Sequence, residues 1–75
     1  MAPVVVYSKP NCMQCNFTKK FLEERNIPFK VKDVMEDEVA LEEVKALGFS
    51  SLPVVVIEGE EPFSGFRPDR LEAIA

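Results

Sequence analysis

The spacing of hydrophobic residues changes several times along the chain, and each spacing predicts a different element. Residues 4–7 form a β-branched run that predicts a strand. From residue 12 or 13 to residue 25 the apolar positions follow a helical spacing, and Asn26 and Pro28 then end the predicted helix. The apolar positions of this helix are Phe17, Phe21 and Leu22.

The middle of the chain predicts a second strand and a second helix. Residues 29–34 alternate apolar and polar side chains, as a half-buried strand does. A helix is expected from about residue 37 to Gly48, because early acidic residues suit a helix start and glycine suits a helix end. Its buried stripe is expected to be Ala40, Val44 and Leu47.

The last third of the chain predicts a hairpin followed by a short helix. Residues 54–57 are continuously apolar, which is typical of a central strand buried on both faces. Residues 58–61 are expected to turn the chain into a short edge strand at residues 62–64. The last helix is expected to begin at Pro68, because proline suits the first helical position. Its inward residues are expected to be Leu71 and Ile74.

This order of elements, β-α-β-α-β-β-α, predicts an α/β fold in one domain spanning residues 1–75. A four-stranded mixed sheet flanked by three helices, with helices on both faces, accommodates that order at this length. No repeat or linker interrupts the pattern.

Composition and charge exclude several classes of function. The chain carries 9 basic and 13 acidic residues, a formal net charge of −4, which argues against nucleic acid as a partner. It has no histidine, so the commonest general base and zinc ligand are absent. The first apolar run is too short for a signal peptide or a membrane span. We therefore expect a cytoplasmic protein with no membrane partner.

The two cysteines of the chain, Cys12 and Cys15, form a C-x-x-C pair just after the first predicted strand. A helix N-terminus presents free N–H groups and the positive end of the helix dipole, and both favour a thiolate. Two intervening residues keep the sulfur atoms within disulfide reach. We expect thiol–disulfide exchange with no cofactor beyond this pair. Cys12 would be the exposed nucleophile and Cys15 the shielded resolving thiol.

Two other interpretations of the cysteines have less support. A structural zinc site usually needs four thiolate or imidazole ligands, and the chain supplies two. The cysteines could also be inert and buried, but the polar neighbours Asn11, Gln14 and Asn16 favour an exposed loop.

Three segments resemble the glutaredoxin-like NrdH-redoxins of the thioredoxin superfamily, and the resemblance covers nearly the whole chain. They are Cys12-Met13-Gln14-Cys15-Asn16, Leu52-Pro53-Val54-Val55 and Phe63-Ser64-Gly65-Phe66-Arg67-Pro68-Asp69. The last is the most specific, because a C-x-x-C pair with a proline before a strand describes the whole superfamily.

The resemblance implies a thioredoxin-like fold with a cis bond before Pro53, although X-Pro base rates alone favour trans. The backbone of Leu52 would then pair with an extended peptide. Met13 and Phe66, together with Phe63, are candidates for a hydrophobic docking surface, and core packing is the alternative for both phenylalanines. The implied role is electron donor to the large subunit of a class Ib ribonucleotide reductase, with thioredoxin reductase and NADPH as the electron source.

Glutaredoxins hold glutathione with polar and acidic groups at the start of the last helix, where this chain has residues 65–69. In the NrdH-redoxins, the corresponding segment resembles a hydrogen-bonded support for the end of the domain. Two positions differ from what is usual in the NrdH-redoxins and in the thioredoxins. Phe63 stands where many relatives have tryptophan, and residues 4–7 lack the buried aspartate with which thioredoxins deprotonate the resolving cysteine. Lys9 is a candidate for lowering the pKa of the Cys12 thiol, although a solvated lysine is the commoner outcome.

Two alternative functions stay open at this point. One is a glutaredoxin reduced by glutathione. The other is a carrier of an iron–sulfur cluster, which would need Cys12 from two copies and further thiolates. A monomer is the expected oligomeric state for a redoxin of this size.

Overall fold

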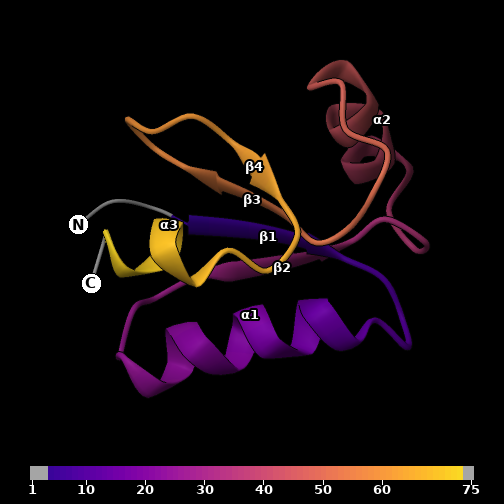
Figure 1. The fold of residues 1–75 in the computed structure, drawn as a ribbon. Coiled ribbons are helices and arrows are strands. Elements are labelled where there is room, and N and C mark those ends of the chain that lie inside the picture. The colour runs from indigo at the N-terminus through magenta and orange to yellow at the C-terminus, as the bar shows by residue number, and fades with distance from the viewer. Residues whose placement is uncertain (1–3, 74–75) are drawn as a thin grey trace.

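The computed structural model describes residues 4–73, which form a mixed four-stranded sheet with three helices packed against it (Figure 1). In chain order the elements are β1 (Val4–Ser8), α1 (Met13–Glu24), β2 (Lys30–Asp33), α2 (Glu38–Ala46), β3 (Val54–Ile57), β4 (Phe63–Ser64) and α3 (Pro68–Glu72). The predicted order is therefore confirmed. Ile74, expected to face inward from the last helix, lies outside the described residues. Within residues 4–73, none of the helices combines the length and apolar character needed to cross a membrane.

The strands are arranged in the order β2-β1-β3-β4, so β1 and β3 are central. Strand β1 runs parallel to β2 and antiparallel to β3, and β4 is antiparallel to β3. Because parallel strands need a crossover, α1 connects β1 to β2 across one face of the sheet (Figure 1). This connection places the start of α1 just beyond the end of a central strand.

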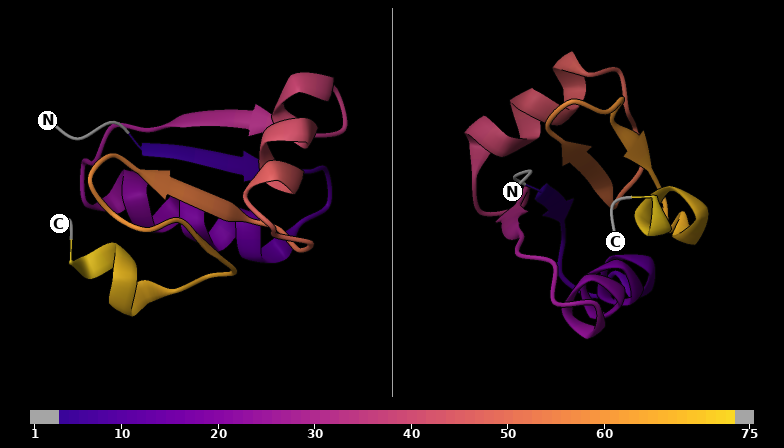
Figure 2. Two further views of the ribbon diagram at one scale, coloured as in Figure 1. Left: turned by 90° about the horizontal axis from the view of Figure 1, so that it is seen from above. Right: turned by 90° about the vertical axis from the view of Figure 1, so that its left-hand side faces the viewer.

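Alternating side chains of the central strands fill two separate cores. Helices α1 and α3 cover one face of the sheet and α2 covers the other (Figure 2). On β3, Val55 and Ile57 point to the first core, whereas Val54 points to the second. The uninterrupted apolar run predicted for this strand therefore serves both faces.

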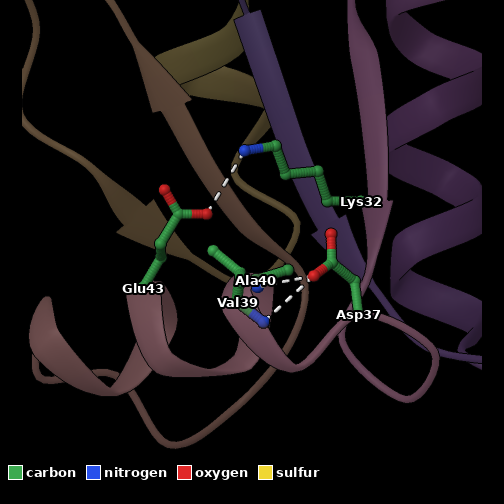
Figure 3. Close-up of polar contacts among 5 residues, drawn as sticks. All are labelled: Lys32, Asp37, Val39, Ala40 and Glu43. Carbon is green, nitrogen blue, oxygen red and sulfur yellow. Dashed lines mark hydrogen bonds and ion pairs between the residues drawn. The ribbon is translucent and has the colours of Figure 1, made fainter.

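Polar contacts join α2 to the edge strand β2 (Figure 3). Asp37 caps the helix, because its Oδ1 accepts the backbone N–H groups of Val39 and Ala40 at 3.0 and 3.3 Å. Lys32 of β2 donates to Glu43 of α2 over 3.2 Å, and this hydrogen bond raises the pKa of Lys32. The Asp37 bonds therefore cap α2, and the Lys32–Glu43 pair links it to β2.

The burial of the helices corrects two expectations. On α1 the line that faces the sheet is Cys15, Thr18 and Leu22, whereas the Phe17 side chain is 49% exposed. Thr18 tolerates burial because its hydroxyl donates to the carbonyl of Gln14 at 3.0 Å. Leu47, expected in the buried stripe of the second helix, is instead the C-cap residue after Ala46 and is exposed, so the buried residues of α2 are Ala40 and Val44.

Candidate active site

The first turn of α1 is built around Cys12, which is the N-cap residue of the helix. Asn11, at a φ of 59°, turns the chain between the end of β1 and this cap. The backbone N–H of Cys15 donates to Cys12 Sγ at 3.1 Å, and the N–H of Asn16 donates to the Cys12 carbonyl at 3.1 Å. The sulfur of Cys12 therefore lies where the helix presents free N–H groups.

Cys12 and Cys15 form a disulfide, with their Cα atoms 5.2 Å apart. Cys12 keeps 8% of its surface exposed, whereas Cys15 is fully buried. A pair of cysteines that can form a disulfide can, when reduced, exchange with an outside disulfide through the more accessible sulfur. The expectation of an exposed Cys12 is therefore wrong for the disulfide form, because the disulfide and the first turn of α1 bury both cysteines; Cys12 is the more accessible of the two.

The loop before β3 is joined to the segment that follows β4. The bond between Leu52 and Pro53 is cis, as the sequence resemblance implied. The carbonyl of Pro53 accepts the N–H of Gly65 at 2.8 Å. A Cβ atom added to Gly65 would lie 3.7 Å from Oε1 of Gln14, so the last of the three segments also reaches the cysteine motif. Tertiary structure thus brings together all three segments that carry the resemblance.

An aromatic cluster joins α1 to the segment before α3. The ring of Phe66 lies 5.9 Å from that of Phe17 and 6.1 Å from that of Phe21, in tilted and edge-on arrangements. These rings, with Lys20 and Glu24, line an open groove of about 370 Å³. The cluster fixes the position of Phe66, and hence of the neighbouring Gly65.

The two phenylalanines proposed for a docking surface have different environments. Phe63 is buried in the core beside β3, so the expectation that its ring contributes to an exposed surface is wrong, and core packing applies. It is pinned there because β4 pairs it with Val55 and because the guanidinium of Arg70 lies 4.9 Å above its ring. Phe66 is half-buried at the groove.

The remaining predicted site residues differ in burial and in their contacts. Met13 and Lys9 are exposed, and Ser64 is half-buried opposite Val54 in the sheet. Arg67 precedes α3, and its Nε lies 3.6 Å from a carboxylate oxygen of Asp69.

Comparison with known proteins agrees with this geometry. The glutaredoxin family model matches residues 4–61. The glutaredoxin-like protein NrdH of Lactococcus lactis subsp. cremoris is 43% identical over 72 residues, covering 96% of this chain and 99% of the relative. The chain belongs to the NrdH-redoxins of the glutaredoxin family. This redoxin is therefore a thiol–disulfide oxidoreductase with Cys12 and Cys15 as its redox-active pair.

Solved structures place the same fold around the pair. The NrdH-redoxin of Escherichia coli, whose structure is described as the basis of a thioredoxin-like activity profile, superposes with a TM-score of 0.90 at 36% identity. That comparison covers 97% of this chain and 95% of the other. A glutaredoxin of Archaeoglobus fulgidus gives a TM-score of 0.80 at 29% identity, covering 97% and 85%. The thioredoxin-like fold expected for this redoxin is thus confirmed.

Sequence reasoning missed two residues that shape the site. Asn11 adopts the left-handed conformation that positions the cap, and its residue type carried a usable signal because asparagine is enriched there. Phe17 was expected on the apolar face of the helix but lies at the groove beside Phe66. No local sequence pattern tells whether a phenylalanine on this helix packs against the sheet or lies at the groove.

Metal binding has no ready site in residues 4–73. Among these residues, no group of three or more cysteine, aspartate or glutamate side chains is placed to hold a metal ion. The zinc and iron–sulfur alternatives would both require ligands from a second chain.

Proposed function

We propose that this redoxin is the cytoplasmic electron donor to the large subunit of a class Ib ribonucleotide reductase and that thioredoxin reductase reduces it with NADPH. The observation that carries this proposal is the arrangement at the start of α3. In glutaredoxins, polar and acidic groups at this position hold glutathione. Here the backbone N–H of Gly65 is used within the protein, and the carboxylate of Asp69 is paired with Arg67.

Three contacts support that reasoning. The N–H of Gly65 donates to Pro53 at 2.8 Å, so it is not free to bind a ligand. The carboxylate of Asp69 lies 3.6 Å from Arg67, which offsets the charge that would attract the amine of glutathione. Phe66 packs into the aromatic cluster and presents an apolar surface beside them. A protein reductase with an apolar contact surface fits this environment better than glutathione does.

The chemistry follows from the two cysteines. In the reduced protein, the thiolate of Cys12 attacks a disulfide in the large subunit of the ribonucleotide reductase. A mixed disulfide forms while one thiolate of that subunit leaves. The thiolate of Cys15 then attacks Cys12 Sγ, releases the second substrate thiolate and restores the Cys12–Cys15 disulfide. Each turn transfers two electrons and two protons to the substrate.

The geometry at the helix start assists the first step. The N–H of Cys15 points at Cys12 Sγ over 3.1 Å, and the dipole of α1 adds partial positive charge at the same place. Both stabilise the negative charge that Cys12 carries before it attacks. Thioredoxin reductase would complete the cycle by reducing the disulfide.

A glutathione-dependent glutaredoxin is the second candidate, because the matching family model is that of glutaredoxins. Reduction of a protein disulfide by this redoxin, followed through NADPH consumption, separates the two. One reaction contains thioredoxin reductase, and the other contains glutathione with glutathione reductase. We expect turnover with thioredoxin reductase alone, and then stimulation of a class Ib ribonucleotide reductase. Turnover with glutathione alone would refute the argument from the α3 segment.

A further inference from the structure

Met13 lies between the two cysteines at the first position of α1, and 71% of its surface is exposed. Cys12 Sγ, by contrast, belongs to a side chain that is only 8% exposed. A partner sulfur that reaches Cys12 must enter through a small opening, so the partner also covers the neighbouring side chains. Met13 follows Cys12 directly in the chain and offers such a partner a large, exposed apolar side chain.

The apolar surface continues from Met13 along α1. Phe17 follows one helical turn later on the same side of the helix and is 49% exposed. Phe17 in turn contacts Phe66, with ring centroids 5.9 Å apart. Met13 therefore stands at the redox end of an exposed apolar strip, a position suited to partner contact.

When the two cysteines are joined in their disulfide, Met13 is the oxidisable side chain of the Cys12–Cys15 motif. Both cysteines of the chain are joined in the disulfide, which offers a peroxide no thiolate. We infer that Met13 is a site of reversible peroxide oxidation that controls docking of protein partners at the Cys12–Cys15 centre. This inference rests on the proposed function, in which the partners are proteins.

The step is an oxygen transfer from a peroxide such as hydrogen peroxide. A lone pair of the Met13 thioether sulfur attacks one peroxide oxygen, the O–O bond breaks, and water leaves. Sulfur loses two electrons and peroxide gains two. The product is a methionine sulfoxide, whose polar S–O group replaces an apolar surface in the contact, and methionine sulfoxide reductases reverse the change.

A second methionine provides a control matched for exposure. Met35, in the loop between β2 and α2, is also 71% exposed but does not belong to the cysteine motif. The disulfide forms of the wild-type, Met13→Leu and Met35→Leu proteins would be treated with hydrogen peroxide and desalted. Peptide mass spectrometry would then locate the added oxygen. Each treated protein is compared with its own untreated sample.

Two assays with protein partners measure docking, and one small reductant controls for the disulfide itself. We expect peroxide to lower kcat/KM with thioredoxin reductase about fivefold, mainly through KM, for the wild-type and Met35→Leu proteins. Dithiothreitol-driven reduction of insulin should slow similarly. Met13→Leu should keep its untreated values, and sulfoxide reductases should restore the wild type. Direct reduction of the disulfide by dithiothreitol should be unchanged in all samples.

The inference is overturned if Met13 stays unoxidised while Met35 is oxidised, or if Met13 sulfoxide forms and both protein assays are unchanged. Equal losses in treated Met13→Leu and wild-type protein would also overturn it. Failure of the proposed function has a separate signature, because untreated protein would then not turn over with thioredoxin reductase. The insulin assay needs no reductase and would still decide the role of Met13.

Discussion

Replacing Gly65 with alanine is expected to lower the free energy of unfolding by about 1–2 kcal/mol, through backbone strain alone. Gly65 has a φ of +83°, a backbone conformation that residues with a Cβ atom rarely adopt. The added Cβ would meet its nearest atom, Oε1 of Gln14, at 3.7 Å, which is an ordinary van der Waals distance. The steric term is therefore small, and the conformational term decides the result.

Gly59→Ala is a matched control for this substitution. Gly59 lies in the turn between β3 and β4 with a φ of +86°, and an added Cβ there would meet nothing within 4 Å. Both variants should lose similar stability, and each kcal/mol should lower the melting temperature by about 4–8 °C in a domain of this size. Only Gly65 donates to Pro53, so only Gly65→Ala should also reduce activity.

Urea unfolding of the disulfide forms, followed by circular dichroism, measures the loss of stability. The rate with thioredoxin reductase, measured well below the melting temperature, reports on the site. An unchanged unfolding midpoint for Gly65→Ala would refute the strain argument. A loss above about 3 kcal/mol would mean that contacts, not φ, dominate the cost. If Gly59→Ala lost as much activity, the effect would be global and the local role of Gly65 would be wrong.

Three further predictions concern the disulfide, the core and the tyrosine. Cys12→Ser should abolish disulfide reduction, whereas Cys15→Ser should accumulate a mixed disulfide visible on a non-reducing gel; full multiple-turnover activity of Cys15→Ser would contradict the dithiol cycle. Leu22→Ala should cost about 2–5 kcal/mol in urea unfolding, because Leu22 is fully buried in the core under α1, and a loss below about 1 kcal/mol would mean that the core refills the cavity. Burial, followed by the charge of Glu43, raises the pKa of Tyr7, so Glu43→Gln should lower it, as measured by the near-ultraviolet absorbance of this single tyrosine. Because the folded pKa is raised above 10.0, the stability linked to Tyr7 is complete below the unfolded value and is lost as the pH rises through the folded one; an unchanged titration in Glu43→Gln would refute this coupling.

The sequence by itself determined the features that depend on a few neighbouring residues. The C-x-x-C pair, the end of the first helix near Asn26 and the doubly buried strand at residues 54–57 could all be predicted, because helix ends and continuous apolar runs are local features. The order of the seven elements followed from the same patterns.

Only the tertiary structure decided which side chains of those elements pack against another element of the chain. Phe63 and Phe66 are close in sequence, yet β4 places the first in the core and α1 holds the second at a groove. Likewise, Thr18 is buried against the sheet, whereas its neighbour Phe17 is 49% exposed and contacts Phe66 from the segment before α3. Burial is a property of two surfaces that are distant in the chain, whereas a periodic pattern describes only one of them. For that reason the reactive pair could be predicted from the sequence, and the surface around it could not.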